Sequence, residues 1–179
     1  MKLSLANFME FRTTLDTTSK IITGFITVFF LLFLSQNAIK LEHETKNMLT
    51  VMATSALLIA IYIYCYGYRP IKYVVNNEGV TITRLFKSVK LDIRNIRQIF
   101  PTSKESMEWT LRSFGNGGLF GYFGNFSNPK FGPMTWYATR KNNYVIIEMK
   151  DNRTIVLTPD DPEMANEINK ILISASSKE

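Results

Sequence analysis

Cysteine and histidine are almost absent from this chain. Its 179 residues include one cysteine, Cys65, and one histidine, His43. A single cysteine excludes a disulfide framework and a thiolate metal cluster. A Ser/His/Asp or Cys/His catalytic set needs a histidine close to its nucleophile, whereas His43 stands in a short polar segment, KLEHETKN, that we interpret as a solvent-exposed loop. We therefore expect a protein that is not an enzyme, with no catalytic residues, no metal and no cofactor.

Charge is missing from two long apolar runs, Ile21–Ile39 and Met48–Tyr68. About twenty helical residues span roughly 30 Å, the thickness of the hydrocarbon core of a bilayer. A backbone inside that core must satisfy its own hydrogen bonds, which a helix does. The sequence thus predicts a transmembrane helical hairpin over residues 20–68. Two alternatives, a buried helical pair in a soluble core and a cleaved signal peptide, fit less well because the second uncharged run follows the first directly.

Details of the second run suggest how it is placed. Its small residues predict a close approach to the first helix, and its terminal tyrosines are typical of an interfacial aromatic belt; these residues are Ala53, Ser55, Ala56, Ala60, Tyr62, Tyr64, Tyr66 and Tyr68. The segment between the runs is neutral, whereas Arg12, Lys20, Arg69 and Lys72 flank them. The positive-inside bias then predicts a multi-pass protein of the cell (inner, cytoplasmic) membrane, with both termini and the C-terminal domain in the cytoplasm.

The N-terminal segment, residues 1–19, contains a clean alternation. Apolar Met9 and Phe11 alternate with charged Glu10 and Arg12, and the pattern continues to Leu15. Period two predicts a half-buried strand over residues 9–15, and an isolated strand needs a sheet to join. The C-terminal domain offers one on the same side of the membrane. The alternative is an interfacial helix, because the apolar residues near position 8 also share a helical face.

After Pro70 the chain changes to short strand-like runs divided by turn residues. The expected strands are residues 71–75, 80–86, 89–93, 96–101, 106–111, 135–139, 144–149 and 154–158, with hairpin turns at Asn142-Asn143 and Asp151-Asn152. Asp160 and Asp161 can then cap a final helix, whose apolar stripe is formed by Met164, Ile168, Ile171 and Leu172. This order predicts an antiparallel β-sandwich or barrel closed by one C-terminal helix.

Particular segments resemble those of the bacterial PH domain family. They are YVVNNEGVTI, DIRNIRQI, RSFGNGGLFGYFGNF, WYAT and VIIEMKDNRTIVLTPDDPEMANEINKIL. The resemblance covers about residues 70–175, and members of this family are often joined to a transmembrane hairpin. It implies an all-β PH-like split barrel or sandwich with a capping α-helix, and it implies no agreed activity.

The most distinctive of these segments is rich in glycine and aromatics, residues 114–126. It lacks the Gly-Lys-Ser/Thr ending of a phosphate-binding loop. It is either a long loop whose aromatics fold back onto the sheet or an exposed apolar loop with a basic rim. From the second possibility we expect a surface that binds the membrane or a partner, formed by Arg112, Leu119, Phe120, Tyr122, Phe123, Lys130, Arg140 and Lys141.

The net charge of +6 also bears on function. A basic domain beside a bilayer is attracted to anionic headgroups, whereas helix-turn-helix, zinc-finger and RNA-binding signatures are absent from the sequence. We expect a non-catalytic, membrane-anchored module that binds anionic lipid headgroups or a partner protein, and no nucleic acid. The alternative is an accessory or scaffold subunit of a membrane complex, with its contacts made by the hairpin.

Overall fold

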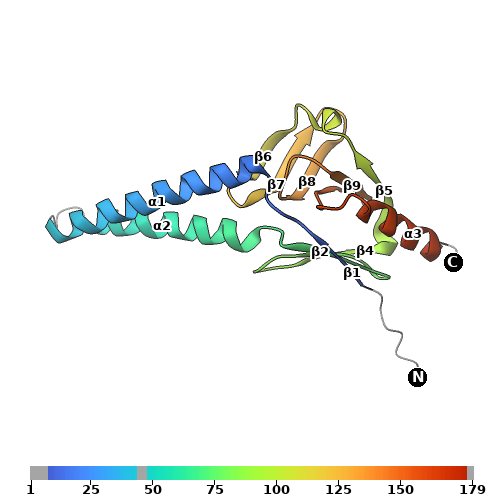
Figure 1. The fold of residues 1–179 in the computed structure, drawn as a ribbon, viewed down its shortest axis with the longest axis horizontal. Coiled ribbons are helices and arrows are strands. Elements are labelled where there is room, and N and C mark those ends of the chain that lie inside the picture. Colours follow the sequence, from blue (N-terminus) through green and yellow to red (C-terminus); the bar gives the residue numbers. More distant parts are fainter. Residues whose placement is uncertain (1–7, 44–47, 177–179) are drawn as a thin grey trace, which may run out of the picture.

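The computed structural model describes residues 8–43 and 48–176. Two long helices, α1 (Thr17–His43) and α2 (Met48–Tyr68), project together from one end of a β domain that carries a C-terminal helix, α3 (Met164–Ser176) (Figure 1). The strands are β1 (Met9–Arg12), β2 (Lys72–Asn76), β3 (Gly79–Thr83), β4 (Val89–Asp92), β5 (Ile96–Thr102), β6 (Leu111–Gly118), β7 (Gly121–Asn128), β8 (Gly132–Ala138), β9 (Tyr144–Met149) and β10 (Thr154–Leu157). Two short 3₁₀ helices, η1 (Ile93–Asn95) and η2 (Glu105–Met107), connect strands.

The helical hairpin, α1 with α2, is held by one seam of side chains. The half-buried and buried positions of α2 recur every three or four residues, at Val51, Ser55, Leu58, Tyr62 and Cys65, which is the spacing of a helix packing along one stripe. Within the seam the Tyr62 ring stacks on Phe30 with centroids 5.4 Å apart, and its hydroxyl lies 2.8 Å from the Thr27 hydroxyl. The expected packing of the small residues is largely wrong, because Ala53, Ala56 and Ala60 lie outside this stripe and are exposed.

Both helices are long and apolar enough to cross a membrane. The rest of the chain covers them very little: none of the most apolar window of α1 is buried, and 6% of that of α2. The core helices of a soluble protein would be mostly covered by other elements. The exposed apolar surface of this pair therefore disfavours the soluble-core alternative.

The first sheet has four antiparallel strands in the order β1-β2-β3-β4. β1 pairs with β2, so that Met9 lies opposite Val75 and Phe11 opposite Tyr73. Met9 and Phe11 pack against the domain core, while Glu10 points outward and pairs with Lys72 at 2.6 Å. The strand expected over residues 9–15 is therefore present at Met9–Arg12 and stops before residue 13, and this part of the chain is not a helix. The chain enters and leaves the helical hairpin from one folded unit.

The second sheet has six strands in the order β5-β9-β10-β8-β7-β6. Its pairs are antiparallel except β8 with β10, which run parallel. Because β10 lies between β8 and β9, the segment at Asn142-Asn143 is a crossover and not the expected hairpin turn. The turn at Asp151-Asn152 does join an antiparallel pair, and Asn152 takes the positive φ of 64° that asparagine tolerates.

Two apolar clusters flank the six-stranded sheet. The first fills the space between the two sheets, and Met164 and Ile168 of α3 are fully buried in it. The second lies on the outer face of the six-stranded sheet, around Trp136 and Ile146. The predicted β-sandwich closed by a C-terminal helix is therefore confirmed.

Two features expected from the sequence differ in the structure: the strand at residues 106–111 and the capping of α3 by Asp160. The strand expected over residues 106–111 is absent before Leu111, where β6 begins: Met107 is buried at η2, and the Asn128 amide donates to the Ser106 and Glu108 carbonyls, which holds residues 106–110 as a turn. Asp160 does not cap α3, because its carboxylate accepts the Thr14 N–H at 2.8 Å and so binds the N-terminal segment.

Candidate functional site

The segment expected to be a glycine/aromatic loop is instead a β-hairpin, formed by β6 and β7. Gly115 and Gly124 face each other across it with φ of 123° and 120°. A Cβ on Gly115 would overlap the Phe123 carbonyl oxygen, and one on Gly124 would overlap that of Phe114. These glycines are therefore required by the close approach of two strands, and not by a loop that must stay adaptable.

The prediction that Phe120 and Phe123 lie on an exposed surface is wrong. They are 7% and 5% exposed and form a cluster with Cys65 of α2, to which the half-buried Leu119 is added. The Phe120 ring meets Tyr62 and Tyr66 edge to face, with centroids 5.1 and 5.3 Å apart. The surface that covers these rings belongs to the helical hairpin, roughly sixty residues earlier in the chain.

Side chains of α1 bind the backbone of the turn that joins β6 to β7. The buried Ser19 donates its hydroxyl to the Gly118 carbonyl at 2.7 Å, and the Phe120 N–H donates to the Thr23 hydroxyl at 2.9 Å. The β6–β7 hairpin is thus seated on both helices. We call this region, with the last turn of α2, the helix–domain junction.

Asp16 connects α1 to the sheet at the junction. Its carboxylate caps α1 by accepting the Ser19 N–H at 2.7 Å, and it also accepts the Tyr122 hydroxyl at 3.2 Å and the Lys141 N–H at 3.0 Å. Nearby, Arg140 forms an ion pair with Asp160 at 2.5 Å and donates to the Thr14 carbonyl at 3.1 Å. The charge of Arg140 is therefore compensated inside the fold.

The other residues that were predicted to bind a membrane or partner lie in two separate regions of the domain. Lys130 lies in the β7–β8 turn, at the end of β7 far from the junction, where its ammonium lies 3.3 Å from the Ser106 hydroxyl. Arg112, Tyr122 and Lys141 come together on a cavity of about 440 Å³ in the outer face of the six-stranded sheet. We call it the outer cavity; its other lining residues are Met107, Trp109, Thr110, Gly117, Phe126, Trp136 and Tyr144.

Burial raises the pKa of both tyrosines in this cavity, and the nearby Asp16 carboxylate raises each further. The hydroxyls of Tyr122 and Tyr144 are therefore neutral near pH 7. Nothing in the sequence indicates directly that Trp136 and Tyr144 line one cavity with Arg112, because β8 and β9 are connected to β6 only through the strand order β9-β10-β8-β7-β6 of the folded sheet.

A second group that the sequence analysis missed surrounds the last turn of α2. The Phe86 N–H donates to the Gly67 carbonyl at 3.1 Å, which places the β3–β4 loop beside α2. Leu85 and Phe86 are 57% and 52% exposed there. One signal could have identified them, since two adjacent apolar residues between Arg84 and Lys87 break the alternation of the strand expected over residues 80–86.

Cations accompany this apolar loop. The Arg84 guanidinium lies 5.1 Å from the Tyr68 ring centroid, and that of Arg69 lies 4.5 Å from the Tyr66 centroid. Lys87 is exposed in the same loop. The junction therefore presents exposed apolar side chains, two arginines stacked on tyrosine rings and the exposed Lys87 at the level where α2 enters the domain.

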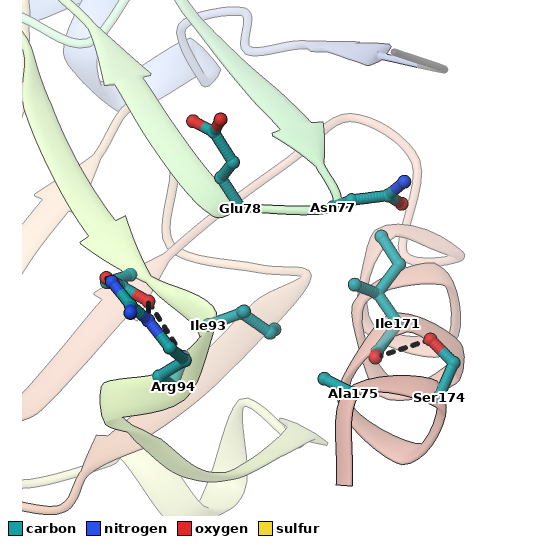
Figure 2. Close-up of a pocket in the computed structure, with 8 residues that line it drawn as sticks. Asn77, Glu78, Ile93, Arg94, Ile171, Ser174 and Ala175 are labelled. Atoms are coloured by element: carbon teal, nitrogen blue, oxygen red, sulfur yellow. Dashed lines mark hydrogen bonds and ion pairs between the residues drawn. The ribbon is translucent and has the colours of Figure 1, made fainter. Parts of the chain in front are cut away.

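A hollow of about 540 Å³ at the opposite end of the domain offers different chemistry. Figure 2 shows Asn77 and Glu78 on the β2–β3 turn across from Ile171 of α3, with Arg94 held by hydrogen bonds. Arg94 pairs with Asp92 at 2.6 Å and lowers the pKa of that carboxyl to about 2. Because this cation is compensated and Glu78 is acidic, the hollow is poorly suited to an anion.

One comparison with known proteins gives a match. A family model described as Bacterial PH domain matches residues 71–171, which include every strand from β2 onward and most of α3. No curated protein and no solved structure matches the chain.

Proposed function

Because this chain belongs to the bacterial PH domain family, we propose that it is a non-catalytic binding module that α1 and α2 anchor in the cytoplasmic membrane. Its ligand in this proposal is the anionic headgroup layer beside the helical hairpin. The β domain then lies on the cytoplasmic side, as the flanking charges favour.

The observation that carries the proposal is the pairing of two features at one end of the domain. Two apolar helices stand almost uncovered, and the point where α2 ends is surrounded by Arg69, Arg84, Leu85, Phe86 and Lys87. In a bilayer this level is the headgroup region, where apolar rings and cations are both stabilised. Each well-placed cation contributes about 1 kcal/mol toward an anionic surface.

Anchoring and orientation are tested by labelling in intact cells. In a Cys65→Ala background, single cysteines are placed at position 43, between the helices, and at position 77, in the β2–β3 turn. A membrane-impermeant maleimide should label position 43 in intact cells and position 77 only after lysis. The reverse pattern would refute the orientation, and labelling of both positions in intact cells would refute the spanning hairpin.

Headgroup binding is tested by lipid co-purification. The full chain, extracted gently from mixed membranes, should retain phosphatidylglycerol in excess over its share of the membrane. Lys87→Glu should lower this enrichment and Lys150→Glu should not, because Lys150 follows the end of β9 far from the junction. Equal effects would point to net charge alone, and no enrichment would refute the ligand assignment.

The alternative function, a scaffold subunit of a membrane complex, is favoured by the outward position of Ala53, Ala56 and Ala60, since small residues let a second helix approach closely. A stoichiometric partner in the same mild-detergent preparation, lost on Ala56→Leu, would support this function.

A further inference from the structure

The outer cavity has the composition of an anion site. Its lining includes two cations, Arg112 and Lys141, and no aspartate or glutamate. Neither cation forms an ion pair within the part of the chain that the structure describes. Since the tyrosine hydroxyls are neutral, the lining carries a formal charge of +2. The Asp16 carboxylate beside these tyrosines lies outside the lining and is bound by the Tyr122 hydroxyl and by the N–H groups of Ser19 and Lys141.

Both cations are placed over the cavity by their neighbours. The Arg112 guanidinium lies across Gly117, so closely that a Cβ at that position would come within 2.5 Å of Nη1. The Lys141 ammonium lies 5.0 Å from the Tyr122 ring centroid, while its backbone N–H is fixed by Asp16. Arg112 comes from an edge strand and Lys141 from the β8–β9 crossover, so the fold brings them together from different segments.

The floor of the cavity is aromatic. Trp136 is 2% exposed and stacks on Phe126 with ring centroids 4.4 Å apart. Its indole N–H is buried and finds no acceptor among the described residues. An unpaired buried donor is unfavourable, and a ligand that brings an oxygen acceptor into the cavity is one way in which its cost can be relieved.

From these features we propose that the outer cavity binds a phosphoester. Arginine holds phosphate oxygens with two parallel N–H donors, and lysine adds a point charge. The volume of about 440 Å³ exceeds that of a bare phosphate and leaves room for the alcohol to which it is esterified. The aromatic floor provides a surface for the carbon skeleton of that alcohol.

The phosphoester has two possible sources. A lipid headgroup fits because Tyr122, on the cavity floor, is hydrogen-bonded to Asp16 at the first turn of α1; this source rests on the proposed membrane function. A soluble phosphoester, such as glycerol phosphate, would bind without a membrane. The chemistry of recognition is the same in both cases, so the experiment has one arm for each.

Tryptophan fluorescence can report binding, because the two tryptophans of the chain, Trp109 and Trp136, both line the outer cavity. In the first arm the full chain in neutral detergent is titrated with glycerol 3-phosphate, and glycerol serves as the probe without phosphate. In the second arm the chain is placed in nanodiscs of phosphatidylcholine, with and without phosphatidylglycerol. We expect a saturable change of tryptophan emission in at least one arm and none with glycerol.

The variants Arg112→Gln and Lys141→Gln should each weaken this response by about tenfold or more, since a hydrogen bond to a charged group is lost. Both side chains are exposed, so the fold should survive, which near-ultraviolet circular dichroism checks. Lys130→Gln is the matched control and should respond as wild type. A response in the detergent arm identifies a soluble phosphoester, and a response in nanodiscs alone identifies a lipid.

Two results would overturn the proposal: no saturable change in either arm, or a change that Arg112→Gln and Lys141→Gln leave intact. Neither depends on lipid co-purification at Lys87. The phosphoester site and the proposed headgroup binding can therefore fail separately.

Discussion

The Ser19 hydroxyl and the Gly118 carbonyl oxygen lie 2.7 Å apart, and this hydrogen bond joins α1 to the β6–β7 hairpin. Ser19 is fully buried although it stands in the first turn of a helix that is otherwise largely exposed. The bond therefore belongs to the junction and not to the surface of the helical hairpin. It indicates that the two parts of the chain are packed together at a defined place.

Ser19→Ala should destabilise the protein by about 1 kcal/mol, because a buried carbonyl loses its closest side-chain donor. Thr23, at 3.4 Å from the same oxygen, compensates only weakly. Thermal unfolding of the full chain in detergent measures the effect. Ser174→Ala removes an exposed hydroxyl that bonds within α3 and should leave the midpoint unchanged; equal shifts would show that the junction bond contributes nothing.

Phe120→Ala should lower the free energy of unfolding by about 3–5 kcal/mol, the range for truncation of a buried phenylalanine to alanine. The ring is 7% exposed and contacts tyrosines of α2. Phe114→Ala is the matched control on the same β-hairpin, because Phe114 is 74% exposed, and it should change stability by less than about 0.5 kcal/mol. Denaturant unfolding of the two variants tests this, and similar midpoints would mean that Phe120 is not held against α2.

Gly67 and Phe86 should be energetically coupled. A Cβ at position 67 would overlap the Phe86 ring, which therefore must move in Gly67→Ala. In a Phe86→Ala background the ring no longer occupies this space, and Gly67→Ala should instead stabilise α2 by up to about 1 kcal/mol, because alanine favours a helix more than glycine does. A double-mutant cycle in thermal unfolding measures the coupling. Additive effects would show that the β3–β4 loop does not rest on the last turn of α2.

Acid should weaken the connection between β5 and β9 through Glu148. Arg97, at 2.5 Å, and Gln98, at 2.7 Å, bind this carboxylate and lower its pKa below the ordinary 4.5. Because the folded-state pKa is the lower one, the contribution is complete above the unfolded-state pKa and is lost as the pH falls through the folded-state value. It is therefore absent in the strongly acidic range.

The test compares wild type with Glu148→Gln by thermal unfolding between pH 3 and pH 7. The difference in the free energy of unfolding should be below about 1 kcal/mol at pH 7, since the Arg97 side chain is 53% exposed. This difference should shrink with acidification. Asp151→Asn removes an exposed ion pair with Arg153 within one turn and should have a smaller effect. A difference that grows on acidification would contradict the assignment.

Several features of this protein follow from the sequence by itself. The absence of charge from Ile21–Ile39 and Met48–Tyr68 predicts two long helices, because nothing but a helix or a closed barrel satisfies an apolar backbone in lipid. The alternation at Met9–Arg12 and the stripe of α3 predict which side chains are buried. These are local periodicities, and each determines a face without reference to the rest of the chain.

Only the tertiary structure decided what those faces meet. The aromatics of residues 119–123 look like an exposed loop until α2 lies beside them and buries Phe120 and Phe123. Arg140 and Arg112 look alike in sequence, yet Asp160 compensates one and the other lines the outer cavity. Charge compensation and burial depend on contacts between segments far apart in the chain, and the strand order β8-β7-β6 with β10 beside β8 sets those contacts.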